Sequence, residues 1–156
     1  MRLQMAVGLS YDAELLILDE PTSGLDPLAR DELVELLADL MIDERRSILF
    51  SSHITSDLEK IADFVTVLDD GRVLESAPLD ELKARYRVVR GGGVAPEGLI
   101  GTRQTGAGWE ALATTTLATT LGPGVVVEPP TLEDIAIRLA KRGRASRRHG
   151  KEHADA

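Results

Sequence analysis

Two adjacent carboxylates follow directly on a run of four apolar residues. The chain reads LLILDEPTSGLDP from Leu15 to Pro27, so Asp19 and Glu20 end the apolar run and a turn with Pro and Gly follows. Neighbouring carboxylates that lose hydration cost about 1–3 kcal/mol unless a cation or hydrogen bonds compensate. A magnesium ion with a nucleotide phosphate would compensate: one carboxylate would hold the metal through water, and the other would accept a proton from an attacking water. A strand-end Asp that caps the next turn is the simpler alternative.

A histidine stands at a similar place after a second apolar run. The segment Ser47–Ser51 contains Ile48, Leu49 and Phe50, and His53 comes just past its end. An imidazole there can donate a hydrogen bond to a transferring phosphoryl group where charge develops. A single histidine at a strand end is more often structural, so this interpretation depends on the acidic pair upstream.

Local patterns indicate the elements that position these residues. The continuous apolar run at 15–18 predicts a strand covered on both faces in a parallel sheet. Asp26 and Pro27 have the types of an N-cap and a first helical residue, and the apolar spacing that follows predicts a helix to about Glu44. The carboxyl ends of parallel strands are where open α/β sheets bind ligands.

The pattern continues with a second strand and a second helix. The segment 47–51 predicts another buried strand, and Ser56 with Glu59 has the spacing of a capping box for the helix that follows. Asp70-Gly71 between two β-rich runs predicts a hairpin, and Pro78 is expected to open a helix that ends near Tyr86.

Strands that alternate with helices predict an α/β fold with a mainly parallel sheet. We expect a main domain over residues 1–86, with a short helix, or the end of one, from Leu3 to Leu9 near its start. A small α/β accessory segment over 87–142 is rich in Gly, Ala and Thr and ends in an amphipathic helix from Thr131. Residues 143–156 are expected to form a basic, disordered tail.

Composition excludes several classes of protein. The 156 residues include no cysteine, so disulfides and thiolate metal sites are excluded, and a cytoplasmic location fits. No apolar run approaches the roughly 20 residues that span a bilayer, and no secretory pattern is visible. Residues 1–137 carry a net charge of −13 and residues 138–156 a net charge of +5. The acidic body disfavours a nucleic-acid partner, while the basic end is either a solvated tail or a contact for phosphates, acidic lipid or the acidic body itself.

Taken over its full length, LLILDEPTSGLDP resembles the Walker B motif and D-loop of ATP-binding-cassette (ABC) ATPases. The segment SSHITSDLEKIADFVTVLDDGRVL resembles the switch-histidine region and hairpin of the drug and peptide exporter branch. The resemblance implies ATP and Mg²⁺ as cofactors. Asp19 would help to hold Mg²⁺ through water, Glu20 would be the general base, and His53 would contact the γ-phosphate.

The resemblance also implies a fold and partners. The fold would be a partial P-loop NTPase, and Ser23, Gly24 and Asp26 would belong to the loop that faces a second cassette in a dimer. The chain would be the ATP-binding subunit of an exporter that couples Mg-ATP hydrolysis to transport. It would lie at the inner face of the cell membrane through a transmembrane permease subunit, without inserting directly into the membrane.

Two motifs of that family are missing from the printed sequence. It contains no G-x-x-x-x-G-K-[ST] phosphate-binding loop (Walker A) and no LSGG signature. The chain therefore resembles the carboxyl-terminal half of a cassette. Because the P-loop provides most direct phosphate contacts, we expect weak ATP binding and little hydrolysis by the chain alone. The alternatives are a catalytically inactive interaction fragment and a non-transport ABC-type ATPase of DNA repair.

Overall fold

Two compact units make up the chain, a first unit over Met1–Ala62 and a second unit over Asp63–Ala156. The computed structural model describes the backbone of residues 13–152 and the side chains of residues 13–145. The short helix expected at Leu3–Leu9 and the last residues of the expected tail lie outside the described part. Each unit is described by itself.

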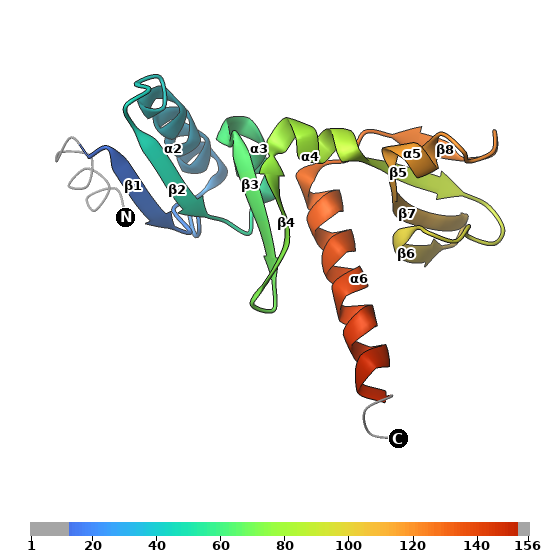
Figure 1. Ribbon diagram of the computed structural model, residues 1–156. Coiled ribbons are helices and arrows are strands. Elements are labelled where there is room, and N and C mark those ends of the chain that lie inside the picture. Colours follow the sequence, from blue (N-terminus) through green and yellow to red (C-terminus); the bar gives the residue numbers. More distant parts are fainter. Residues whose placement is uncertain (1–12, 153–156) are drawn as a thin grey trace. The chain divides into compact units, whose positions relative to one another are not determined.

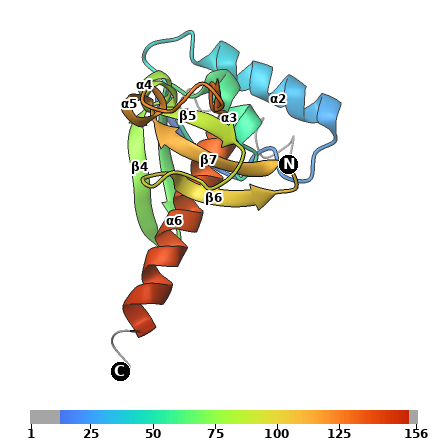
Figure 2. The same cartoon turned by 90° about the vertical axis from the view of Figure 1, so that its right-hand side faces the viewer.

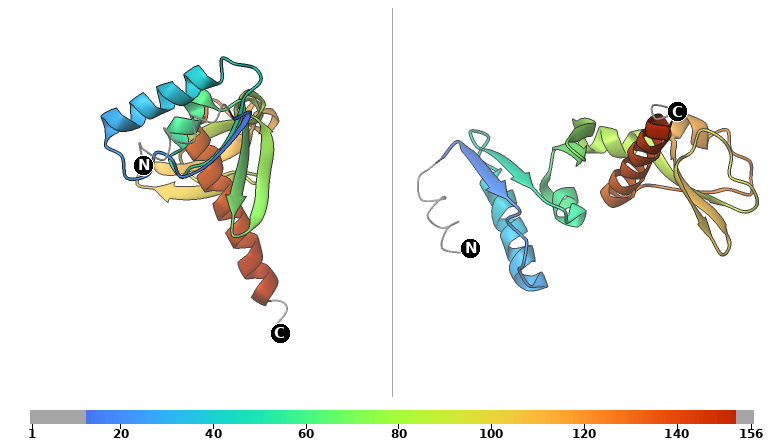
Figure 3. Two further views of the ribbon diagram at one scale, coloured as in Figure 1. Left: turned by 90° about the vertical axis from the view of Figure 1, so that its left-hand side faces the viewer. Right: turned by 90° about the horizontal axis from the view of Figure 1, so that it is seen from below.

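The described part of the first unit, residues 13–62, contains two strands and two helices (Figure 1). They are β1 (Leu15–Asp19), α2 (Pro27–Leu40), β2 (Ser47–Ser51) and α3 (Thr55–Ile61). The two strands pair in parallel, and the register matches Leu15 with Ser47 and Asp19 with Ser51. As Figure 3 shows, α2 lies alongside this pair. Strand, helix and strand therefore form one βαβ unit, as the sequence predicts.

The start of α2 follows the predicted capping chemistry. The Asp26 carboxylate accepts hydrogen bonds from the backbone N–H groups of Leu28 at 3.1 Å and Ala29 at 3.0 Å, and Pro27 takes the first helical position. Three side chains of the helix are buried: Leu33, Val34 and Leu37. A good N-cap stabilises a helix by about 1 kcal/mol, so Asp26 fixes the point at which the preceding turn joins α2.

The prediction that β1 is covered on both faces is wrong. Burial alternates along both strands: Leu16 and Leu18 are half-buried, whereas Leu15 and Ile17 are exposed. Because Ile17 pairs with Leu49, the exposed Leu49 side chain lies on the same face. A continuous apolar run cannot tell a strand with one covered face from a strand with two.

The predicted capping box before α3 is also wrong. This helix begins at Thr55 with Ile54 as its N-cap, and no side chain caps it. Instead, the Ser52 hydroxyl accepts a hydrogen bond from the Ile54 N–H at 3.0 Å. The turn that leads into α3 thus begins at Ser52, before the Ser56 position at which the spacing of Ser56 and Glu59 predicts the cap.

The second unit opens with an antiparallel hairpin of β3 (Phe64–Asp69) and β4 (Arg72–Pro78). Asp70 (φ 52°) and Gly71 (φ 70°) form its turn with two positive φ angles, which confirms the predicted hairpin. The predicted helix follows as α4 (Leu79–Arg85), with Leu79 and Leu82 buried.

A four-stranded antiparallel sheet forms the rest of the second unit, in the order β6-β7-β5-β8 (Figure 2). The four strands are β5 (Tyr86–Gly91), β6 (Ile100–Thr105), β7 (Gly108–Thr114) and β8 (Val126–Glu128). Two helices accompany them: α5 (Thr115–Ala118) and α6 (Leu132–Glu152). The mixed α/β class is confirmed, but a mainly parallel sheet is not, since only β1 and β2 pair in parallel among residues 13–152. The tight turns between β3 and β4 and between β6 and β7 can join only antiparallel neighbours.

Helix α6 packs on β6 and β7 of this sheet. Leu132, Ile135 and Leu139 are buried, and the buried Arg138 guanidinium donates to the Gly101 carbonyl at 3.2 Å and to the Glu110 carboxylate. Val89, Trp109, Ala111 and Ala113 of the sheet form an apolar cluster with Ala118 of α5. The helix continues to Glu152, past its predicted end at Arg142, because Gly143 costs only about 1 kcal/mol in a helix.

Candidate active site

The carboxyl ends of β1 and β2 bring three polar residues together. The Ser51 hydroxyl donates a hydrogen bond to Asp19 Oδ1 at 2.5 Å. The Glu20 N–H donates to the same hydroxyl at 3.0 Å and to the Ser51 carbonyl at 3.2 Å. Ser51 therefore fixes the direction of the Asp19 carboxylate and the backbone of Glu20 at once.

Glu20 adopts a backbone conformation that is unusual for its residue type. Its φ is +48°, in the left-handed region, which costs a residue other than glycine about 1 kcal/mol. Its carboxylate Oε2 lies 2.8 Å from Nδ1 of His53. Because the Glu20 and His53 side chains are 36% and 68% exposed, both stay accessible to a ligand from solvent. Strain of this kind is frequent at functional sites.

The loop after Glu20 is a pair of overlapping turns. The Ser23 N–H donates to the Glu20 carbonyl at 3.1 Å, and the Leu25 N–H donates to the Thr22 carbonyl at 3.3 Å. Gly24 has φ +73°, which a glycine adopts without strain. Ser23 and Gly24 are exposed, so the loop presents a small polar surface.

The structure therefore separates the residues singled out in the sequence into two groups. Asp19, Glu20 and His53 lie together at the ends of the two strands. Ser23, Gly24 and Asp26 lie on the following loop, where Asp26 directs its carboxylate to the start of α2.

Oxygen donors are the ligands that Mg²⁺ prefers, and Asp19 and Ser51 present a carboxylate and a hydroxyl side by side. The described residues contain no group of three or more His, Cys, Asp or Glu side chains that could hold a metal ion by themselves. Mg²⁺ is usually held by one or two carboxylates together with substrate phosphates. The donor set fits that mode.

Ser51 was not among the residues expected from the sequence. A serine at the end of a predicted strand carries no signal alone. The register of the two strands, which places Ser51 opposite Asp19, would have identified it.

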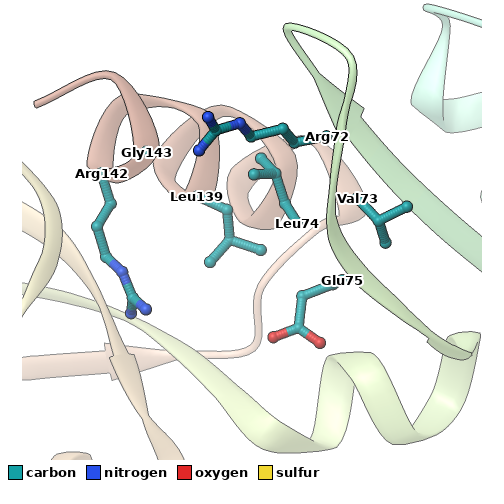
Figure 4. Close-up of a pocket in the computed structure, with 7 residues that line it drawn as sticks. All are labelled: Arg72, Val73, Leu74, Glu75, Leu139, Arg142 and Gly143. Carbon is teal, nitrogen blue, oxygen red and sulfur yellow. The ribbon is translucent and has the colours of Figure 1, made fainter. Parts of the chain in front are cut away.

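A separate cavity of about 420 Å³ lies in the second unit, between β4 and α6 (Figure 4). Arg72 and Leu74 line it from the strand, and Leu139 and Arg142 from the helix. The carboxylate in its lining, Glu75, accepts a hydrogen bond from the Tyr86 hydroxyl at 2.6 Å and contacts Arg85 at 3.3 Å. Burial and this hydrogen bond raise the pKa of Tyr86 to about 12. The cavity contains none of the residues singled out in the sequence.

Comparisons with known proteins find a family model and relatives that match part of the chain. Residues 2–56 match the family described as "AAA domain, putative AbiEii toxin, Type IV TA system". The bacitracin transport ATP-binding protein BcrA of Bacillus licheniformis is 44% identical over 86 residues, which cover 55% of this chain and 28% of that protein. An uncharacterized ABC transporter ATP-binding protein of Nostoc is 46% identical over 81 residues, which cover 52% of this chain and 24% of that protein.

A lantibiotic transport ATP-binding protein of Streptococcus pyogenes is 42% identical over 73 residues, which cover 47% of this chain and 31% of that protein. The chain thus spans less than a third of the length of these relatives. Their names confirm the resemblance to ABC transporter ATP-binding proteins that the motifs predict. Among the described residues, no helix is both long and apolar enough to cross a bilayer.

Proposed function

We propose that this chain, about half of which is similar to ABC transporter ATP-binding proteins, is part of the ATP-binding subunit of an ABC-type exporter. Within that subunit it provides the water-activating side of the nucleotide site. The observation that carries this proposal is the 2.8 Å contact between Glu20 Oε2 and His53 Nδ1 at the ends of two paired parallel strands. Open α/β sheets bind ligands at this edge.

Glu20 is the proposed general base. Its carboxylate accepts the proton of the attacking water, and the contact with His53 holds it in place for that transfer. When the ring of His53 carries both protons, Nδ1 donates to Glu20 and Nε2 is a donor for a phosphate oxygen. A donor aimed at that oxygen stabilises the charge that develops there during the reaction.

Asp19 and Ser51 are the residues proposed to hold Mg²⁺. The Ser51 hydroxyl fixes the orientation of the carboxylate before any ligand arrives, so little reorganisation is needed on binding. Bound Mg²⁺ would supply neutralisation of the phosphate charge. The ATP phosphates would need a further phosphate-binding loop, because the printed sequence contains no G-x-x-x-x-G-K-[ST] run.

The loop of Ser23, Gly24 and Asp26 is the proposed contact with a second cassette. Its exposure and tight turns support this role, because a rigid polar loop loses little conformational entropy when a partner covers it. Relatives named for the transport of bacitracin and lantibiotics support a transmembrane permease as the other partner. We place the chain at the cytoplasmic side of that permease.

The nucleotide site is tested with Mn²⁺-ATP, in which the paramagnetic ion replaces Mg²⁺. Nuclear magnetic resonance of the full chain should show broadening confined to the backbone amides near Asp19 and Ser51. Asp19→Asn should remove most of this broadening, because it removes the charged oxygen that attracts the ion. Asp43→Asn is the matched control, since this half-buried carboxylate of the first unit pairs with Arg45 and Arg46 instead.

No broadening at these amides with saturating Mn²⁺-ATP would contradict the proposed site and favour an inactive interaction fragment. The role of Glu20 as the general base is tested in membranes that contain the assembled transporter. There Glu20→Gln should lower ATP turnover by about 10²-fold or more while ATP still binds, because a general base contributes about that much. Unchanged turnover would exclude Glu20 as the base.

A further inference from the structure

Helix α3 begins two residues after His53 and is too short to be stable alone. It has seven residues and lacks a side-chain cap. Isolated helices shorter than about 12 residues are marginal in water. Packing against α2 must therefore decide where α3 lies, and with it the chain segment that carries His53.

One contact between the two helices involves a buried carboxylate. Asp57 of α3 is only 2% exposed, and its Oδ1 lies 3.5 Å from the Arg30 guanidinium of α2. No described group makes a hydrogen bond to its Oδ2. A buried carboxylate is stable only near a compensating charge, so the position of Asp57 depends strongly on Arg30.

A second ion pair joins the two helices with the charges exchanged: here α2 provides the anion, at the residue after Arg30, and α3 provides the cation. Lys60 Nζ of α3 lies 2.5 Å from Asp31 Oδ1 of α2. The Lys60 ammonium lowers the pKa of Asp31, and Asp31 raises the pKa of Lys60. On α2 the order is cation then anion, and on α3 it is anion then cation. A helix shifted by one turn would break both pairs at once.

Each of the two helices is attached to one half of the Glu20–His53 pair. The turn from Glu20 to Asp26 leads directly into α2, and His53 is two residues from α3. We infer that Arg30 and Asp57 are positioning residues that hold α3 on α2 and so keep His53 Nδ1 within hydrogen-bond distance of Glu20. Their effect on catalysis rests on the proposed function, but their effect on this contact does not.

The test follows the ring of His53 in the full chain without nucleotide. Its carbon and nitrogen signals are recorded by nuclear magnetic resonance and assigned with His53→Gln. Glu20→Gln gives the reference position, because it weakens the ionic part of the contact. Asp57→Asn and Arg30→Met should move the His53 signals most of the way to that reference. Arg30→Lys, which keeps the charge, should leave them close to the parent position.

Asp43→Asn is the control, because it removes a carboxylate of the same unit that pairs with Arg45 rather than with α3. It should leave the His53 signals in place. If Asp57→Asn does not fold, Arg30→Met decides the matter, since the Arg30 side chain is 34% exposed and water can enter the space that it leaves beside the Asp57 carboxylate.

The inference is overturned if the His53 signals stay at the parent position in Arg30→Met and Asp57→Asn, or if Glu20→Gln itself fails to move them. A positive result together with a negative Mn²⁺-ATP experiment would keep the positioning role and remove the nucleotide site. The two hypotheses can therefore fail separately.

Discussion

At the scale of single residues, the candidate site depends on one strained backbone angle and one serine. Glu20 contacts His53 from a left-handed conformation, and the Ser51 hydroxyl connects the Glu20 backbone to the Asp19 carboxylate. A local strain of about 1–3 kcal/mol persists only where neighbouring contacts determine the conformation. Ser51 provides two of those contacts, so it has a larger role than its small size indicates.

Ser51→Ala should therefore lower the local stability of the strand ends by about 1–2 kcal/mol, since it removes a hydrogen bond to a charged group and one to a backbone N–H. Hydrogen exchange of the Glu20 amide measures this change. Ser47→Ala, at the opposite end of the same strand, is the matched control and should change the exchange by less than about 0.5 kcal/mol. Equal effects of the two variants would contradict a special role for Ser51.

The types of the site residues could be predicted from the sequence, but their contacts could not. Asp19, Glu20 and His53 were singled out because they follow apolar runs, and the structure brings them together. The contact between Glu20 and His53 depends on a positive φ and on the register of two strands about 30 residues apart, and neither is visible in local spacing. The roles assigned to these residues remain predictions.

At the scale of elements, α6 and the four-stranded sheet are joined by a very close approach. Gly101 has φ +61°, and a Cβ at this position would lie 2.8 Å from Cα and from the carbonyl oxygen of Arg138. Arg138 is buried and bonded to the Gly101 carbonyl and to Glu110, so α6 cannot easily move away. The glycine thus permits both the backbone angle and the contact.

Gly101→Ala should destabilise the second unit by about 3 kcal/mol, from the positive φ and the clash together. Trp109 is the single tryptophan and lies in the apolar cluster, so its fluorescence reports unfolding of this unit. Gly93→Ala is the matched control: its φ is +70°, but a Cβ there meets nothing within 4 Å. It should cost about 1 kcal/mol. If both variants lost the same stability, the close approach of Gly101 to Arg138 would not contribute to the cost of Gly101→Ala.

Most elements that depend on local signals were predicted, whereas the antiparallel sheet of the second unit was not. The cap of α2, the Asp70-Gly71 hairpin and helix α4 follow from neighbouring residues. Strands β6 and β7 lie in a Gly-rich stretch without clear alternation, and their pairing with β5 depends on residues far away in the chain. The antiparallel sheet was missed for this reason.

At the scale of the whole molecule, the first unit leaves apolar surface in contact with water. Leu15, Ile17 and Leu49 are 55%, 69% and 63% exposed, and the strand register places them on one face of the β1–β2 pair. Single exposed apolar residues are ordinary, but neighbouring ones on a flat strand pair favour association. The formal net charge of −8 opposes association only at short range, because salt at physiological strength screens the repulsion beyond about 8 Å.

We therefore expect the chain to associate in a concentration-dependent way, and Ile17→Thr with Leu49→Thr to shift it toward monomer. Threonine has a β-branched side chain, which suits a strand, and it reduces the apolar area at both positions, so the pairing of β1 and β2 should survive. Sedimentation velocity over a range of concentrations measures the shift. Ile42→Thr is the matched control, since Ile42 is 78% exposed on the loop after α2 and should leave the association unchanged. A parent chain that sediments as a monomer at every concentration would contradict the expected association, and an equal shift with Ile42→Thr would show that general hydrophobicity, rather than this face, drives it.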